Sequence, residues 1–149
     1  MSRSCYSDDY GDDFPGQLEL YRANVRRSIR SRKGQARLLE LRDALLAMPV
    51  KELHQDVFVT GSEDAPKVCA LGAWALGKGF TEASKMVVSN PDDSEIAAAM
   101  ETHGWPRLVV MDAVYFNDDG VWGKETPAER HRRMLAWVEE NIIPADPQP

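Results

Sequence analysis

Apolar residues recur at helical spacing through the first third of the chain. In residues 17–32 they fall three or four positions apart, as on one face of an α-helix; they are Leu18, Tyr21, Val25 and Ile29. We expect Gly34 to end this helix, because glycine is a weak helix former. A second helix is predicted from about Gln35 to Met48, and Pro49 stops it. Its apolar face consists of Leu38, Leu41, Leu45 and Met48.

The middle of the chain carries a pattern typical of a small β-hairpin. The run 57–60 is β-branched and aromatic, and the turn-rich segment 61–66 leads to a second apolar run at 67–70. The two runs are therefore predicted to pair. From Gly72 the composition becomes helical, and we expect residues 81–88 to form a further helix or an irregular lid.

Two more helices are predicted before the last loop. One begins after Asn90-Pro91 and runs to Thr102, and the other opens at Pro106 and runs to about Phe116. The valines of the second segment are also typical of a strand, which remains the alternative. Because this segment is largely apolar, we assign the pair to the core and not to a DNA-binding helix-turn-helix.

The final helix has the clearest start signal. Thr126 and Glu129 are spaced as a capping box, and Pro127 occupies the first helical position. Its predicted inner face consists of His131, Met134, Leu135, Val138 and Ile142. Together the patterns predict a mainly α fold, a compact single-domain bundle of about six helices with at most a two-stranded β element.

Length and composition are those of one soluble globular domain. The chain has 149 residues, 43% hydrophobic and 28% charged, enough for a core without disulfide or metal support. We divide it into an acidic flexible tail (1–16), a single globular helical domain (17–143) and a Pro-rich end (144–149). The first residues lack a signal-peptide pattern, and no apolar run approaches the length of a membrane span. We therefore expect a cytoplasmic protein without membrane association.

The most informative charge signal is a cluster of cations in an otherwise acidic chain. The net charge is −6, yet seven cations lie in one short window: Arg22, Arg26, Arg27, Arg30, Arg32, Lys33 and Arg37. At helical spacing, Arg22, Arg26, Arg30, Lys33 and Arg37 share one stripe beside the apolar line. The planar arginine fork pairs bidentately with carboxylate or phosphate.

This stripe predicts an anion-binding surface. Its residues are Arg22, Arg26, Arg27, Arg30, Lys33 and Arg37. The alternative is a solvated helix face that the chain's own acids neutralise; the candidates are Glu19, Glu40, Asp43 and the acidic tail. The acidic remainder of the chain disfavours a long polyanion lying across it.

Cys69 is the one candidate nucleophile with a setting of interest. It precedes a predicted helix start, where a thiolate would be favoured, but no catalytic spacing motif accompanies it. The alternative, which we favour, is a small buried hydrophobe. The other cysteine, Cys5, lies in the polar tail, so a disulfide between them is not expected. No metal or cofactor motif is present in the sequence, and we predict neither.

Aromatic and polar residues near the loops complete the candidates. We expect Trp122 to be exposed and to act as a contact anchor, and Trp74, Trp105 and Trp137 to pack in the core. His54 and His103 flank loops and are expected at the surface. The run NDDG at 117–120 has half the acids of a calcium loop, but no glutamate at the required spacing, so we interpret it as a helix-ending turn.

Four segments carry a resemblance to a known group of proteins. They are MSRSCYSDDY at the start, RSRKGQARLLELRDALLAMPVKEL, KVCALGAWALGKG and YFNDDGVWGKETPAERHRRMLAWVEENI. Their order resembles that of small uncharacterised proteins encoded by tailed phages and prophages. Cys5 stands where that group has glycine, and residues 80–105 are the least similar. The resemblance implies a phage origin and no mechanism.

Three functions follow as hypotheses. The first is a non-enzymatic accessory protein that binds a host or phage protein in the host cytoplasm, such as an inhibitor of a host defence complex. The second is a nucleic-acid-binding protein that uses the basic stripe between Arg22 and Arg37. The third is a small cysteine-dependent enzyme that uses Cys69.

Overall fold

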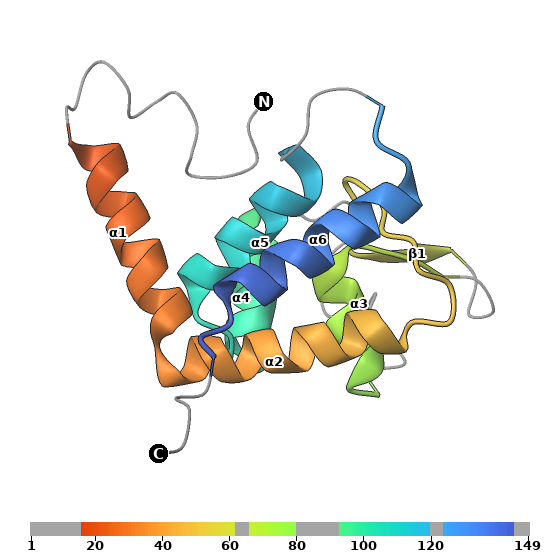
Figure 1. The fold of residues 1–149 in the computed structure, drawn as a ribbon, viewed down its shortest axis with the longest axis horizontal. Helices are drawn as coiled ribbons and strands as arrows, with labels where there is room; N and C mark the ends of the chain where they lie inside the picture. Colours follow the sequence, from red (N-terminus) through yellow and green to blue (C-terminus); the bar gives the residue numbers. More distant parts are fainter. Residues whose placement is uncertain (1–15, 62–65, 80–92, 120–123, 145–149) are drawn as a thin grey trace.

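The computed structural model describes residues 16–61, 66–79, 93–119 and 124–144 (Figure 1). The elements are α1 (Gln17–Arg30), α2 (Arg32–Ala47), β1 (Val59–Gly61), β2 (Pro66–Val68), α3 (Ala70–Gly77), α4 (Asp93–Glu101), α5 (Arg107–Asp119) and α6 (Pro127–Asn141). The acidic segment up to residue 15, the segment 81–88 and the end from residue 145 lie outside the described residues, so their predicted structures stay predictions.

The predicted mainly α fold is confirmed for the part of the chain that the structure describes. It consists of six helices and one two-stranded antiparallel sheet. In that sheet Val59 lies opposite Val68, and Gly61 lies opposite Pro66. The segment that could have been helix or strand, residues 106–116, forms α5.

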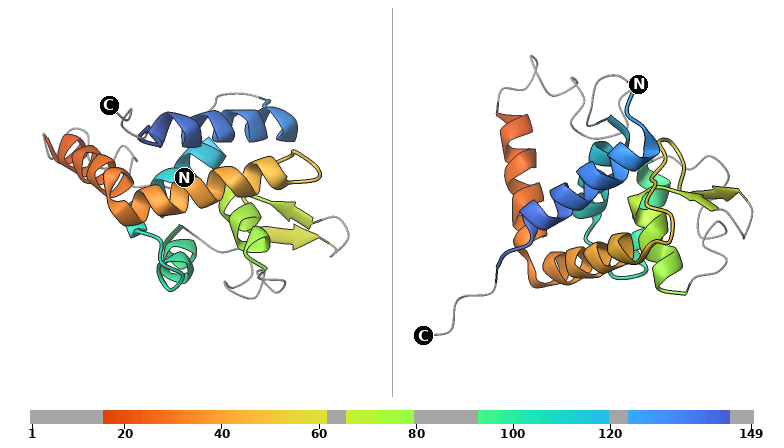
Figure 2. Two further views of the ribbon diagram at one scale, coloured as in Figure 1. Left: turned by 60° about the horizontal axis from the view of Figure 1, so that its bottom comes forward. Right: turned by 45° about the vertical axis from the view of Figure 1, so that its right-hand side comes forward.

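Helix α2 is the element around which the others are arranged. Its predicted apolar positions Leu38, Leu41 and Leu45 are fully buried, and the burial of each leucine contributes about 1.5–3 kcal/mol. The helix contacts α1, α3 and α6. Helix α1 is joined to the N-terminal end of α2, and α3 with the hairpin lies at the C-terminal end of α2, as both Figure 1 and Figure 2 show. The two ends of the molecule are therefore built from different elements.

Three of the tryptophans form part of the core, as predicted. The rings of Trp74 and Trp105 meet edge to face with centroids 5.4 Å apart, a favourable arrangement of aromatic quadrupoles. Trp137 of α6 stacks on Phe116 of α5 at 5.8 Å. These pairs join α3 to the turn before α5, and α5 to α6.

The break between the first two helices differs from its predicted place. The structure interrupts the chain at Ser31, whose backbone is extended, and α2 begins at Arg32. The Ser31 hydroxyl caps α2 by accepting from the Gly34 N–H at 3.0 Å. Gly34 itself is helical and buried. A Cβ there would lie 2.1 Å from the Ser28 carbonyl oxygen, so this glycine permits a close corner and does not end a helix.

We expect Gly34→Ala to destabilise the protein, because the added methyl group would clash with the Ser28 and Ile29 carbonyl oxygens. These are main-chain atoms and can move only if the backbone of α1 moves with them. The structure would open the corner between α1 and α2 at a cost of about 1–3 kcal/mol. Urea unfolding followed by circular dichroism measures this change. Gly77→Ala is the matched control: its new Cβ would meet only Ala44, at 3.3 Å from its Cβ and 3.9 Å from its Cα. We expect the control to change stability by less than about 1 kcal/mol; wild-type stability of Gly34→Ala would contradict the prediction.

Candidate interaction surface

The cation window forms a corner in the structure and not one continuous stripe. Four of its residues lie on α1, namely Arg22, Arg26, Arg27 and Arg30, and three lie on α2, namely Arg32, Lys33 and Arg37. The extended backbone at Ser31 separates the two groups, so the single stripe expected from helical spacing is wrong. The basic residues instead surround the junction of two helices that point in different directions (Figure 1).

The apolar line of α1 faces the body of the protein. Val25 and Ile29 are buried, and Leu18 and Tyr21 are half-buried. Helix α1 contacts α5 and α2 through this side. The arginines between these positions are exposed, so the amphipathic interpretation of the segment is confirmed for α1.

Arg37 is a structural residue and not part of an open surface. Its guanidinium Nη2 lies 3.0 Å from Glu40 Oε1, and its Nη1 donates to the His103 carbonyl at 3.4 Å. Glu40 also accepts from Trp74 Nε1 at 3.1 Å and pairs with Lys78 Nζ at 2.9 Å. Burial opposes ionisation of Glu40, but these donors together hold its pKa below the ordinary value. Arg37 thus helps to join α2, α3 and the 103–104 turn.

Of the six remaining cations, Arg22 lies in the first half of α1, away from the junction. The other five are exposed around the junction, and we name them the basic corner. They are Arg26, Arg27, Arg30, Arg32 and Lys33. No carboxylate of the described residues lies within 4 Å of any of them. The expectation that the chain's own acids neutralise the stripe is confirmed for one pair, since Glu40 binds Arg37. Neither Glu40, which also binds Lys78, nor Asp43, which lies beside Arg42 at 3.5 Å, pairs with the basic corner.

The helix dipoles divide the basic corner into two parts. Arg27 and Arg30 lie in the last turn of α1, where the dipole favours positive charge. Arg32 and Lys33 lie in the first turn of α2, which contains no acid. Positive side chains at the positive end of a helix dipole are unfavourable, since this end favours an anion. An external anion would therefore be stabilised on the α2 side of the corner.

The other predicted contact residue and the histidines are placed differently. Trp122 lies outside the described residues, so its role as an anchor stays a prediction. His54 and His103 are half-buried and not fully at the surface. Burial and the neighbouring Lys67 lower the pKa of His54, which favours its neutral form. His131 is buried as predicted, and its Nε2 is 2.8 Å from the Leu45 carbonyl oxygen.

Cys69 has the environment of a core residue. Its side chain is 4% exposed, and burial raises the pKa of its thiol to about 12. The sulfur accepts from the Gly72 N–H at 3.4 Å and caps α3. All three histidines are among the described residues, and none forms a hydrogen bond with this sulfur. The thiol therefore lacks a base and remains protonated, which disfavours it as a nucleophile.

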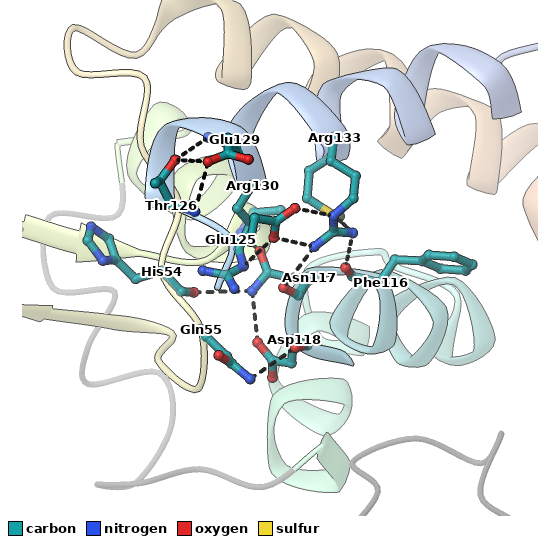
Figure 3. A network of polar contacts seen from close by, with 12 residues as sticks. His54, Gln55, Phe116, Asn117, Asp118, Glu125, Thr126, Glu129, Arg130 and Arg133 are labelled. Atoms are coloured by element: carbon teal, nitrogen blue, oxygen red, sulfur yellow. Dashed lines mark hydrogen bonds and ion pairs between the residues drawn. The ribbon is translucent and has the colours of Figure 1, made fainter. Parts of the chain in front are cut away.

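The motif between α5 and α6 forms a structural network (Figure 3). Asn117 is buried; its Oδ1 accepts from the Ala70 N–H at 3.2 Å, and its Nδ2 donates to the His54 carbonyl at 3.1 Å. Asp118 Oδ1 accepts from the Asp56 N–H at 3.1 Å. These bonds join the end of α5 to the start of α3 and to the segment 54–56. Helix α5 ends within this run, at Asp119, as predicted, and the Asp118 carboxylate is used by the protein itself.

Glu125 organises the other half of the network. Arg133 donates to both of its oxygens, at 2.7 and 2.9 Å, and Arg130 Nε lies 3.2 Å from Oε1. Arg133 also donates to the carbonyls of Phe116 and Asn117 at the end of α5. The predicted capping box of Thr126 and Glu129 is present directly after it. The charged residues of this motif are thus used to hold α5 and α6 together.

A groove that the sequence patterns did not indicate lies at the opposite end of α2. Its volume is about 760 Å³, and it is bordered by α2, the segment 49–54, β2 and α3. Its residues come from four segments whose proximity depends on the tertiary fold. The available sequence signal was the exposed apolar run after Leu46, of which Val50 is 62% exposed.

Comparisons with known proteins leave the function open. No protein-family model, curated protein or solved structure matches the chain. Among the described residues, no helix is long and apolar enough to cross a membrane. In the same part of the chain, no group of three or more histidine, cysteine or acidic side chains could hold a metal ion. The candidate surfaces therefore rest on geometry and charge.

We expect Glu125→Gln to destabilise the protein by about 3 kcal/mol at pH 7, because it leaves two partly buried arginines without their carboxylate. The hydrogen bonds of Arg133 hold the pKa of Glu125 below its ordinary value, although burial opposes this shift. The stabilisation is therefore complete above about pH 4.5 and is lost as the pH falls through the lower folded pKa.

Urea unfolding of wild type and variant between pH 7 and pH 3 measures this difference. The two free energies of unfolding should converge at the acid end. Glu140→Gln makes the same chemical change at an exposed position of α6, and it should leave stability nearly unchanged at every pH. A constant difference between wild type and Glu125→Gln across the range would contradict the assignment.

Proposed function

We propose that this protein is a non-enzymatic accessory protein that binds an acidic surface of a partner protein through the basic corner. One observation carries the proposal. Five exposed cations surround the junction of α1 and α2 without a carboxylate from the described residues, and two of them oppose the dipole of α2. A carboxylate of the partner would pair with these cations and would also interact favourably with the positive end of the α2 dipole.

The chemistry of the rest of the chain supports binding over catalysis. The Cys69 thiol is buried with a raised pKa and its sulfur caps α3. The polar groups of Asn117, Asp118 and Glu125 are used in the network between helices. The main open polar feature at this end of the molecule is positive charge. Arginine at such a surface pairs bidentately with carboxylates and is enriched in protein interfaces.

The net charge of the chain favours a protein partner with a compact acidic patch. The whole chain carries −6, so a long polyanion would meet repulsion wherever it leaves the corner. A folded partner contacts only a limited area and can match the corner alone. From the sequence resemblance, we further propose a phage or prophage origin and a host or phage protein as partner, such as a component of a host defence complex.

Nucleic acid remains the second candidate, because a phosphate satisfies the same cations. Phosphate binding differs from carboxylate recognition in its dependence on salt. Each neutralised phosphate of duplex DNA adds about 0.9 to the slope of log K against log salt. Fluorescence anisotropy with duplex and single-stranded oligonucleotides at several salt concentrations therefore separates the two functions.

We expect Arg26→Glu with Arg30→Glu to abolish partner binding and leave the fold intact. Both side chains are exposed on one face of α1. The control is Lys124→Glu with Arg132→Glu, which reverses two exposed cations elsewhere and takes the net charge by the same two steps of −2, from −6 to −10. Circular dichroism verifies the fold of each variant.

The measurement is quantitative capture of proteins from host bacterial lysate by each immobilised variant. A stoichiometric partner should be retained by wild type and by the control, and lost by the α1 variant. Equal capture by both double variants would show that the basic corner is only a solvated face. Tight oligonucleotide binding that disappears in the α1 variant would replace the protein partner with nucleic acid.

A further inference from the structure

The basic corner is opposite in charge to the acidic tail, the segment that precedes α1. The tail carries one cation and four acids, a net charge of −3, whereas the basic corner consists of five exposed cations. No carboxylate of the described residues lies within 4 Å of these cations. Of the segments outside the described residues, the acidic tail is the most acidic, and it is joined directly to α1.

The acidic tail is long enough to reach the basic corner, although it joins α1 at the opposite end (Figure 1). Measured from the start of α1, Arg26 lies about 14 Å and Arg30 about 20 Å along the helix, at about 1.5 Å per residue. An extended chain covers at most about 3.3–3.6 Å per residue. Asp8 can therefore lie up to about 26–29 Å from Gly16, so it can reach both arginines with slack.

The backbone at the start of α1 favours a return of the chain along this helix. Gly16 has φ 89° and ψ −13°, close to the values of about +80° and 0° at the third residue of a type II turn. Such turns favour proline at their second position, and Pro15 precedes Gly16 in the sequence. A β-turn reverses the direction of the chain, so a turn of this type would lead the acidic tail back alongside α1.

We propose that the acidic tail regulates the basic corner by pairing Asp8 and Asp9 with Arg26 and Arg30, in competition with the partner. The inference rests on the proposed function for its consequence, but the contact itself needs no partner. Exposed ion pairs are individually weak, and the tail gains only the effective concentration of a tethered segment, about millimolar. A partner with several carboxylates therefore displaces the tail, whereas a weakly acidic surface does not.

The contact can be measured with a spin label on Cys5. Cys69 is 4% exposed, and burial raises the pKa of its thiol to about 12. A thiol-reactive nitroxide therefore labels Cys5, which lies close to Asp8 in the sequence. Broadening of the amide resonances of residues 26–33 then reports the approach of the tail, with the ascorbate-reduced sample as reference. We expect broadening at about 10 mM salt that is lost at about 1 M, because the Debye length falls from about 30 Å to about 3 Å.

A charge exchange makes the assignment specific. Asp8→Asn with Asp9→Asn should abolish the salt-dependent broadening, and Arg26→Glu with Arg30→Glu should do the same. Addition of Asp8→Arg and Asp9→Arg to the α1 variant should restore it, because the same ion pairs are then complete with exchanged signs. Circular dichroism verifies that each variant is folded.

The regulatory consequence is measured with fluorescent decaglutamate as the anionic probe. Asp8→Asn with Asp9→Asn should bind this peptide about two- to tenfold more tightly than wild type, since two exposed ion pairs no longer compete. The control is Asp43→Asn with Glu52→Gln, which removes the same two charges at exposed positions. It should leave both the broadening and the affinity for decaglutamate close to those of wild type.

Three outcomes would overturn the proposal. The first is broadening that is unchanged by salt and by Asp8→Asn with Asp9→Asn, since the tail would then approach α1 only because it is attached to it. The second is broadening that arises only between a labelled chain and a separate isotope-labelled chain, which would assign the contact to a second copy. The third is equal decaglutamate affinity of the tail variant and the control.

The experiments separate this proposal from the proposed function. If the salt-dependent contact forms but no lysate protein binds to any variant, the partner-binding function fails and the contact stands. If a lysate protein binds through the basic corner and the broadening does not depend on charge, the function stands and the regulation by the tail fails.

Discussion

The arrangement of the molecule depends on the buried amide of Asn117. One side chain satisfies the first N–H of α3 and the carbonyl of His54, and Asp118 beside it adds two hydrogen bonds to the segment 54–56. A buried amide of this kind is costly unless its hydrogen bonds are complete. Here they are supplied by two other segments, at Ala70 and His54, and by the neighbouring Asp118, so the amide is satisfied only when α5, α3 and the 54–56 segment are packed together.

The hydrogen bonds of Asn117 also position one of the two candidate surfaces. It attaches the segment before β1 to the body, and this segment forms one wall of the groove. Helix α2 spans the distance from there to the basic corner (Figure 1). One end of the molecule thus carries a largely apolar groove, and the other is strongly cationic. The two surfaces would bind through different interactions: burial of apolar area in the groove, and charge pairing at the basic corner.

Local patterns were sufficient to predict much of the fold. The spacing of Leu38, Leu41 and Leu45, the capping box at Thr126 and the β-type runs about the hairpin each depend on residues near in sequence, and the structure contains all three. The corner at Ser31 was misplaced, because the role of Gly34 depends on contact with the Ser28 carbonyl across the turn. In a single sequence, a glycine that ends a helix cannot be distinguished from a glycine that permits close packing.

The candidate site was less predictable than the fold. The cations of the basic corner could be read from the sequence, and Arg37 and Glu40 are an i,i+3 pair on one helix. The bond from Arg37 to the His103 carbonyl, however, depends on an approach between α2 and the 103–104 turn. The groove required four segments to meet. The roles of Asn117 and Glu125 were also hidden, since their partners at Ala70 and Arg130 become apparent only when the helices are placed.

The attachment of α1 has a consequence for its dynamics. Only Val25 and Ile29 of this helix are fully buried, whereas α2 buries three leucines and a glycine. Local opening needs only the free energy of the contacts that it breaks, so α1 can detach and reform while the remaining core stays intact. A partner bound to the basic corner would hold α1 on the core. The free energy needed to order α1 would then reduce the observed affinity for that partner.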